Sequence, residues 1–318
     1  MSRNTSDAAG TIFITGASGV IGHRVAQRLL DAGYHNVRLG AIDPVKLEDM
    51  NEKGAAIADF AWEREETYDQ ALAGAKTVLC VTPYIENWHI HFPAFLIACE
   101  KAKIEHFVKL SFIHCNDELM KVPLVKNHFQ CDKHLMESVV WCKIMNRYTI
   151  IAASHLMSNA LVCQGKEIMS ENKPACFYGA SAGHGVNYVS PNDVAEMTYR
   201  VLMDPEAHAN KEYTVTGREA MTDQSMADIL SKHFNKPVMF VDQPPRVFED
   251  SERCSGDPAW KVKDLVMLEK VKASGIEEDA SFVSHDMEKL CGRKPEMFEQ
   301  YLGAKNFMTP KEMGMWAA

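Results

Sequence analysis

A glycine-rich turn near the start of the chain constrains the fold more than any other feature. The run Thr15-Gly16-Ala17-Ser18-Gly19-Val20-Ile21-Gly22 follows an apolar segment and precedes an amphipathic one. In such a turn Gly16 allows a sharp exit from a strand, Gly19 lets the backbone approach a pyrophosphate, and Gly22 lets the next helix lie close to the sheet. The turn therefore predicts a dinucleotide site in which residues 16–22 contact the phosphates.

The segment after the turn has the pattern of an amphipathic helix. Ile21, Val25 and Leu29 recur every four residues, which places them on one helix face. Gly33 follows where a glycine commonly ends a helix. The free N–H groups in the first turn of this helix, together with the helix dipole, favour a bound phosphate.

Apolar strands and helices alternate from the turn to about residue 160. We expect strands at residues 11–14, 37–42, 55–58, 77–81, 106–110 and 148–153, with helices between them. This alternation predicts an α/β fold of the Rossmann type, with a doubly wound parallel sheet and right-handed crossovers. We expect a dinucleotide-binding domain over residues 1–160, with return segments near 186–217. Residues 161–318 then form a smaller α/β lobe that binds substrate or acts as a lid.

Polar residues follow several of these strands, at the edge where doubly wound sheets bind their ligands. Asp43 either accepts hydrogen bonds from an adenine ribose or caps the next helix ahead of Pro44. Lys46 lies one turn further on, where an ammonium group favours a 2′-phosphate, so the choice between NAD and NADP stays open. Further residues expected at this edge are Asp59 and Phe60 after the third strand, Val81, Thr82 and Pro83 after the fourth, and Ser111 after the fifth.

Charge and cysteine content exclude several classes of protein. The net charge of −9 contains no block of like charges, which argues against direct binding of nucleic acid. The nine cysteines form no C-x-x-C pair and are typical of reduced thiols inside cells. Residues 1–10 are polar, and no apolar stretch is long enough to cross a bilayer, so we expect a cytoplasmic protein without membrane contacts.

Histidine and cysteine residues do not form a recognisable metal site in the sequence. His89 and His91, taken with His114 and Cys115, lack the spacing of a closed tetrahedral zinc site, so we expect no metal.

Motifs in order along the whole chain resemble those of the NmrA-like group of atypical short-chain dehydrogenases/reductases. The resemblance rests on T-G-A-S-G-x-x-G at residues 15–22, the Asp43-Pro44 turn, Val81-Thr82-Pro83, the helix with His128, Met157-x-Asn159, Asp193-Val194-Ala195 and Thr216-Gly217. It implies a Rossmann domain that binds NADP(H) or NAD(H), with Asn159 among the cofactor contacts. Members of this group are reductases, for example of quinones or enone-like compounds, or redox sensors that bind the nucleotide and regulate a partner.

Three departures from the family pattern bear on function. Ile42 stands where the family often has an arginine that holds a 2′-phosphate, and Ala152 stands in place of the arginine of a Leu-Arg-Pro motif. Phe129 occupies the tyrosine position of the Tyr-x-x-x-Lys pair of ordinary short-chain dehydrogenases, with Lys133 at the lysine position. Since a phenyl ring cannot deliver a proton, the usual acid is missing.

Four residues are candidates for the chemistry of hydride transfer. His128 or His155 could donate a proton, Lys133 could position the nicotinamide ribose, and Ser111 could hydrogen-bond a carbonyl oxygen. Each also has a purely structural interpretation, as an exposed, capping or packed side chain.

Two functional classes follow from these features. The first is an NAD(P)H-dependent reductase of a small quinone or enone-like carbonyl compound. The second is a non-catalytic NAD(P)-binding redox sensor that acts through a regulatory protein partner. The missing tyrosine favours the sensor, while the glycine turn and Lys133 suit both. A homodimer is compatible with either class.

Overall fold

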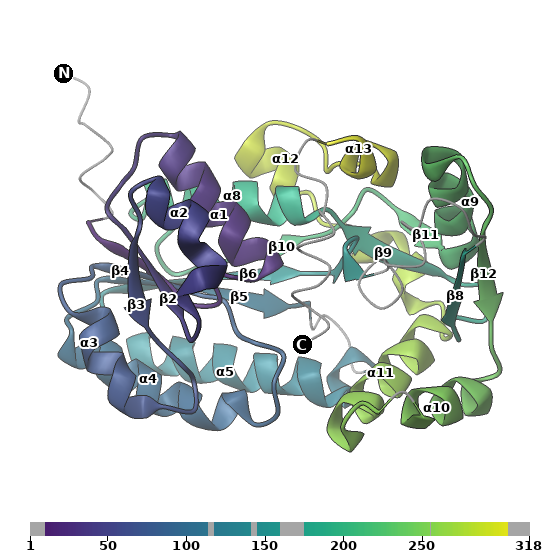
Figure 1. The fold of residues 1–318 in the computed structure, drawn as a ribbon, viewed down its shortest axis with the longest axis horizontal. Helices are drawn as coiled ribbons and strands as arrows, with labels where there is room; N and C mark the ends of the chain where they lie inside the picture. The colour runs from purple at the N-terminus through teal and green to yellow at the C-terminus, as the bar shows by residue number, and fades with distance from the viewer. Residues whose placement is uncertain (1–9, 114–117, 141–144, 160–174, 255, 305–318) are drawn as a thin grey trace. The chain divides into compact units, whose positions relative to one another are not determined.

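The computed structural model describes all residues except 1–9, 114–117, 141–144, 160–174, 255 and 305–318 (Figure 1). The chain divides into two compact units. The first comprises residues 1–112, 127–152 and 194–214, and the second comprises residues 113–126, 153–193 and 215–318. The return segment of the first unit is thus 194–214. The chain also enters the second unit over residues 113–126, a crossing that the division expected from the sequence does not contain.

A seven-stranded sheet with the order β10-β6-β5-β4-β1-β2-β3 forms the centre of the first unit. Strand β1 is parallel to both β2 and β4, since Ile12 lies opposite Val37 on one side and Thr77 on the other. The other registers show that β2 is parallel to β3 and β4 to β5. The strands are β1 (Ile12–Ile14), β2 (Val37–Ala41), β3 (Ala56–Asp59), β4 (Thr77–Cys80), β5 (His106–Phe112), β6 (Arg147–Ala153) and β10 (Lys211–Val215).

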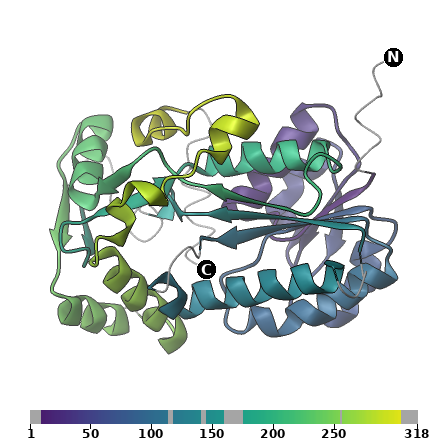
Figure 2. The same ribbon diagram turned by 180° about the vertical axis from the view of Figure 1, so that it is seen from behind.

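Helices cover both faces of this sheet (Figures 1 and 2). Helices α3 (Tyr68–Leu72), α4 (Trp88–Lys101) and α5 (Pro123–Val140) lie on one face. Helices α1 (Val20–Asp31), α2 (Glu48–Glu52) and α8 (Pro191–Met203) lie on the other. This arrangement confirms the predicted doubly wound fold.

Aromatic side chains fill the core between the sheet and helices α3 and α4. The ring of Phe60 contacts those of Phe13, Tyr68 and Phe95, with centroids 5.4, 5.4 and 5.5 Å apart. Trp62 packs against Phe95 at 5.0 Å and Trp88 at 6.2 Å. Aromatic pairs in offset or edge-to-face geometry add to the free energy gained by burying their area, so this cluster holds β1, β3 and α4 together.

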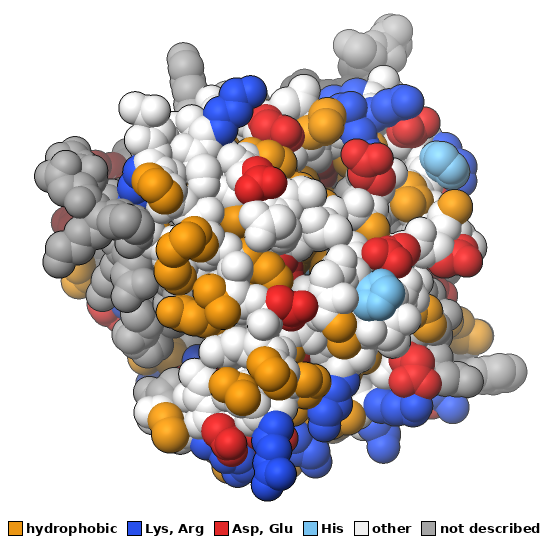
Figure 3. Space-filling view, turned by 90° about the vertical axis from the view of Figure 1, so that its right-hand side faces the viewer, with side chains coloured by type: hydrophobic (Ala, Val, Ile, Leu, Met, Phe, Trp, Pro, Cys, Tyr) orange, Lys and Arg blue, Asp and Glu red, His pale blue; other side chains and the backbone are white. Residues whose placement is uncertain are grey.

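The second unit combines two small sheets with helices. Strands β7 (His155–Leu156), β9 (Gly185–Val189) and β11 (Ala220–Thr222) form one sheet, and β8 (Ala175–Gly179) pairs in parallel with β12 (Val238–Asp242) in the other. Figure 3 views the molecule from the side of this pair, where hydrophobic side chains are interspersed with charged ones. The helices and 3-10 turns of this unit include α9 (Asp223–Phe234), α10 (Pro245–Cys254), α11 (Ala259–Lys272), η5 (Ile276–Glu278), α12 (Asp286–Cys291) and α13 (Phe298–Gly303).

Apolar periodicity predicted most of these elements to within a few residues. Three strands were not anticipated as such, β7 at residues 155–156, β8 at residues 175–179 and β11 at residues 220–222. All three are short strands of the second unit, where pairing with β9 or β12 decides the conformation rather than any local pattern.

Candidate active site

The glycine-rich turn connects β1 to α1 and is fixed by Thr15 on one side. The buried Thr15 hydroxyl donates to the carbonyl of Val81 and accepts from the Val81 N–H, both at 2.8 Å. Gly16 has a φ of +57°, and a Cβ there would lie 2.8 Å from the Val81 carbonyl oxygen. The end of β4 therefore packs directly against the turn, and only glycine fits at residue 16.

The other two glycines of the turn are required for different reasons. A Cβ at Gly22 would lie 2.4 Å from the Gly16 carbonyl oxygen, so the helix approaches the turn too closely for a side chain. A Cβ at Gly19 would meet only that same oxygen, at 3.3 Å. The fold thus tolerates a side chain at residue 19 much better than at residue 22, and what glycine provides at residue 19 is open access to the backbone.

The first turn of α1 suits a bound phosphate group. Gly19 is the N-cap residue, and within the described residues no side chain caps this end of the helix and no acidic residue lies in its first turn. Backbone N–H groups at such a helix end, with the positive end of the helix dipole, stabilise anions. The residues present therefore fit the pyrophosphate of a dinucleotide.

Asp43 makes the capping contact that was one of its two predicted roles. Its Oδ1 accepts a hydrogen bond of 3.1 Å from the Val45 N–H, with Pro44 at the first position of a 3-10 helix at Pro44–Leu47. Lys46 is exposed on this turn. Ile42 and Val45 beside it are 70% and 71% exposed, so the loop after β2 presents apolar side chains where the family often has an arginine.

The two residues after β3 have different environments. Asp59 forms a bidentate pair with Arg64, with N–O distances of 2.5 and 3.0 Å, and the pKa of its carboxyl is lowered mainly by that hydrogen bond. Phe60 is buried in the aromatic core. An adenine at this edge would therefore meet the Asp59–Arg64 pair and the Phe60 backbone rather than the Phe60 ring. Val81, Thr82 and Pro83, after β4, are each partly exposed.

A buried charged group lies in the middle of β5, where Lys109 is opposite Cys80, the last residue of β4. The Nζ of Lys109 is 2.6 Å from Oδ1 of Asp132 on α5, and these side chains are 0% and 3% exposed. Ser111 donates its hydroxyl proton to Oδ2 of Asp132. We call Lys109, Ser111, His128 and Asp132 the Lys109 cluster.

His128 completes this cluster one helical turn before Asp132. Its Nδ1 lies 3.3 Å from Nζ of Lys109, and its ring packs on Trp88 with centroids 5.1 Å apart. The Lys109 ammonium is also 5.8 and 6.0 Å from the ring centroids of Trp88 and Phe92, within the range of a cation–π contact.

Neighbouring thiols do not balance the charge of Lys109. Burial raises the pKa of both Cys80 and Cys131 to about 12, although Lys109 acts in the opposite direction on each. Both thiols are therefore neutral at physiological pH. Burial also raises the pKa of Glu212, and the negative charge of Asp132 adds to this effect. Asp132 is consequently the counter-ion of Lys109.

The structure brings together two of the four predicted catalytic residues, Ser111 and His128. Lys133 instead lies on the outer side of α5, where its side chain is 66% exposed and 3.8 Å from Glu137. Phe129 on the same helix is 37% exposed. Lys133 thus takes no part in the Lys109 cluster.

His155 belongs to a different network, in the second unit. Its Nε2 is 3.0 Å from Oε1 of Glu277, and both side chains are buried. Oε2 of Glu277 accepts a hydrogen bond of 2.9 Å from the Asn187 N–H. This pair ties η5 to β7 and β9. Asn159, the remaining predicted cofactor contact, is exposed at the end of the described stretch of this unit.

Sequence reasoning missed Lys109 and Asp132. The signal for the first was a lysine inside the apolar run of a buried strand, since a lysine is almost never fully buried without a partner. The signal for the second was a carboxylate four residues after His128, on the same face of the helix.

Neither a metal site nor a membrane-spanning helix is found in the part of the chain that the structure describes. There, no group of three or more His, Cys, Asp or Glu side chains could hold a metal ion, while His114 and Cys115 lie outside the described residues. Likewise, none of the described helices is long and apolar enough to span a membrane.

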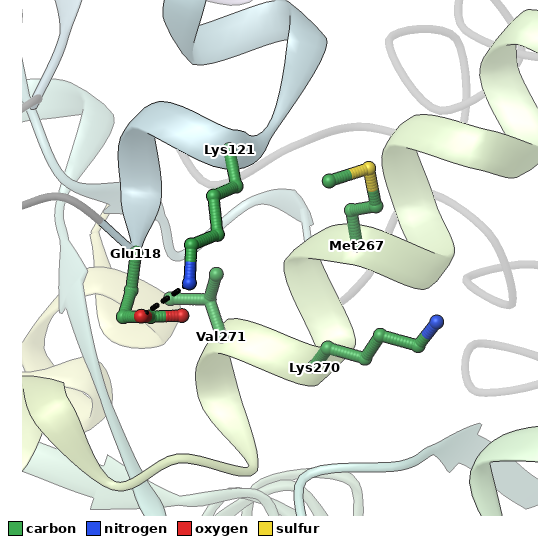
Figure 4. Close-up of a pocket in the computed structure, with 5 residues that line it drawn as sticks. All are labelled: Glu118, Lys121, Met267, Lys270 and Val271. Carbon is green, nitrogen blue, oxygen red and sulfur yellow. Dashed lines mark hydrogen bonds and ion pairs between the residues drawn. The ribbon is translucent and has the colours of Figure 1, made fainter.

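A pocket in the second unit contains none of the predicted site residues (Figure 4). Glu118 and Lys121 form an ion pair of 2.5 Å at one side of it, and Met267, Lys270 and Val271 of α11 line the other. The Glu118–Lys121 pair and the apolar side chains of Met267 and Val271 give this pocket no group suited to hydride transfer.

Known proteins are similar to this chain over most of its length. The model of the NmrA-like family matches residues 8–302. Prestalk A differentiation protein A of Dictyostelium discoideum is 23% identical over 304 residues, which cover 95% of this chain and 94% of that protein.

Solved structures of similar fold include an enzyme and a regulator. An NADPH-dependent quinone oxidoreductase from Escherichia coli, in complex with NADPH, has a TM-score of 0.75 at 20% identity and covers 92% of this chain and 98% of its own. NmrA, a negative transcriptional regulator in complex with NAD, has a TM-score of 0.71 at 14% identity and covers 98% of this chain and 100% of its own. At these identities the likeness establishes the fold.

Proposed function

Because this chain belongs to the NmrA-like family, we propose that it is an NAD(P)H-dependent oxidoreductase that reduces a small quinone or enone-like carbonyl compound. The observation that carries the proposal is the Lys109 cluster on β5, two strands from β1 and the glycine-rich turn, with Lys109 opposite Cys80 at the carboxyl end of β4. Both therefore lie at the carboxyl edge of one parallel sheet, where such folds bind their ligands.

The residues that would hold the cofactor follow this edge. The backbone of residues 16–22 would bind the pyrophosphate, and Asp59, Phe60 and Val81 to Pro83 would line the adenine side. Asp43 would accept hydrogen bonds from the adenosine ribose, or Lys46 would bind its 2′-phosphate. When bound, the reduced nicotinamide supplies a hydride. The similar quinone oxidoreductase is an NADPH enzyme, which supports this class of cofactor without deciding between the phosphorylated and unphosphorylated forms.

The protein itself must provide a proton and orient the acceptor. His128 is the proposed proton donor, since its half-buried ring lies against the charged cluster. The hydroxyl of Ser111 donates its single proton to Asp132. The Ser111 oxygen is therefore suited to accept a hydrogen bond from a ribose or carboxamide group. Roles for Lys133, His155 and Asn159 at this site stay predictions, as do a cytoplasmic location and a homodimer.

A second candidate function is a redox sensor that binds the nucleotide and regulates a protein partner. Phe129 in place of the usual tyrosine favours it, and the similar regulator NmrA binds NAD. A sensor would need the glycine-rich turn but not the Lys109 cluster. The presence of a buried lysine next to a histidine is what favours the enzyme.

The test combines turnover with cofactor binding. We expect the purified protein to oxidise NADPH or NADH in the presence of one or more members of a panel of quinones and enones, followed by the absorbance of the reduced nicotinamide. Tight binding of the cofactor by calorimetry, without turnover above background, would contradict the enzyme and favour the sensor.

The cofactor site is tested by Gly19→Val. A branched side chain would obstruct the phosphate while the fold tolerates a Cβ there, so we expect cofactor affinity to fall roughly a hundredfold or more, about 2.8 kcal/mol. Gly303→Val is the matched control, because a Cβ at Gly303 meets no atom within 4 Å. Unchanged affinity in a folded Gly19→Val protein would refute the site.

A further inference from the structure

We infer that Lys109 holds His128 in the neutral Nε2–H tautomer and replaces the proton that His128 gives up during reduction. This inference rests on the proposed function, in which His128 is the proton donor. It assigns to Lys109 and Asp132 a positioning role that neither the sequence nor the family resemblance indicated.

The contact between Lys109 and His128 determines the tautomer. A lysine ammonium has three donors and no acceptor, so at 3.3 Å the Nδ1 of His128 must be the acceptor. A ring that accepts at Nδ1 carries its proton on Nε2. An imidazolium would place an N–H against the ammonium, so the contact selects the neutral ring.

Asp132 is the counter-ion of the Lys109 ammonium and fixes its position beside His128. The carboxylate is 2.6 Å from Nζ, and its second oxygen accepts the Ser111 hydroxyl proton. Lys109 also donates to the Leu110 carbonyl at 3.4 Å. The three donors of the ammonium thus point at Asp132, His128 and Leu110, and the aromatic rings of Trp88 and Phe92 enclose it.

The proposed step balances in protons and electrons. The bound reduced nicotinamide would supply the hydride and its two electrons to the acceptor, and the resulting oxyanion takes the proton from Nε2 of His128. Lys109 passes a proton to Nδ1 as the Nε2–H bond breaks, so the ring stays neutral and Lys109 becomes an amine. After the product leaves, a solvent proton binds Nε2 and the Nδ1 proton returns to Lys109, which restores the starting state.

The tautomer can be measured without any substrate. Long-range ¹H–¹⁵N correlation spectra of the full chain labelled on histidine report which ring nitrogen of His128 carries the proton. We expect the Nε2–H form in the wild type at neutral pH. A His128 ring in the Nδ1–H form, or as an imidazolium, would overturn the inference.

Variants at Lys109 test the relay. Lys109→Met removes the ammonium but leaves Asp132 without its counter-ion, so the double variant Lys109→Met with Asp132→Asn is made in parallel to preserve folding. We expect the double variant to bind the cofactor as the wild type does, to lose the fixed tautomer, and to transfer hydride about tenfold to a hundredfold more slowly in single turnovers. Lys101→Met, an exposed lysine at the end of α4, is the control and should change none of these.

A proton inventory separates a relay from a structural effect. Because two protons move in one step in the wild type, its single-turnover rate should fall non-linearly as the deuterium content of the solvent rises. The single-turnover rate of the double variant, in which one proton moves, should fall linearly. A linear inventory in the wild type, or an unchanged tautomer and rate in the double variant, would overturn the relay. If the wild type turns over no acceptor, the proposed function fails, while the spectra still decide the Lys109–His128 contact.

Discussion

Each unit of the molecule contains a fully buried acid–base pair whose surroundings can be compared. In the first unit Lys109 of β5 pairs with Asp132 of α5, with Ser111 and the half-buried His128 beside them. His155 and Glu277 in the second unit are buried to a similar degree, but the carboxylate also accepts a backbone N–H, from Asn187.

On the proposed function, this difference distinguishes a pair that serves the reaction from a pair that stabilises the fold. A buried ion pair is weak support for stability, because the cost of desolvation offsets much of the attraction between the charges. The pair at Glu277 links a 3-10 turn to two strands through side chain and backbone together, which is the pattern of a structural bond. Besides a contact with the Leu110 carbonyl, the pair at Lys109 contacts two polar side chains, those of His128 and Ser111.

The largest expected effect is on the stability of the first unit. Asp132→Ala leaves the ammonium of Lys109 buried without a counter-ion, and we expect a loss of about 3–5 kcal/mol in the free energy of unfolding. Urea unfolding followed by circular dichroism measures it. Asp49→Ala, at a half-exposed carboxylate near His23, should change stability by no more than about 0.5 kcal/mol. Equal losses in the two variants would show that Asp132 does not balance a buried charge.

The contrast between Asp132 and Lys133 also shows why the sequence predicted the fold better than the site. The glycine turn and the apolar periods are local patterns, and they predicted the sheet and its helices. On α5, the spacing of the family motif pointed to Lys133. Successive side chains on a helix differ in direction by about 100°, so neighbouring residues face different surroundings. Asp132 therefore faces β5 while Lys133 faces outward. Which strand a helix packs against is not a local pattern, so the partner of Lys109, far away in sequence, could not be predicted.

A smaller effect, with a defined pH dependence, is expected in the second unit. Burial alone would raise the pKa of Glu277, but His155 and the Asn187 N–H outweigh it and hold that pKa below the usual 4.5. Because the pKa is lower in the folded protein, this carboxylate contributes stability above about pH 4.5, and the contribution is lost as the pH falls through the folded-state pKa.

Replacing this carboxylate should therefore affect stability but not catalysis. We expect Glu277→Gln to cost about 1–3 kcal/mol at pH 7, a difference that shrinks as the pH falls below 4.5, with kcat/KM within twofold of the wild type. Urea unfolding at a series of pH values tests this. Glu219→Gln, at an exposed position of the same unit, is the control. A loss of activity as large as that of the Lys109 variants would place this pair in the reaction.

The smallest effect comes from a matched pair of serines, one beside each acid–base pair. Ser111 donates to Asp132, and Ser154 donates to Oδ1 of Asn187 at 3.1 Å, with both side chains buried. Each change to alanine removes one buried hydrogen bond, so both variants should lose about 1 kcal/mol of stability. Only Ser111→Ala should also lower kcat/KM, by a few-fold to about tenfold, because only Ser111 presents an acceptor at the cofactor edge. If both variants lower kcat/KM alike, or neither does, the distinction between a reactive and a structural pair is wrong, since stability alone would then account for every effect at the two positions.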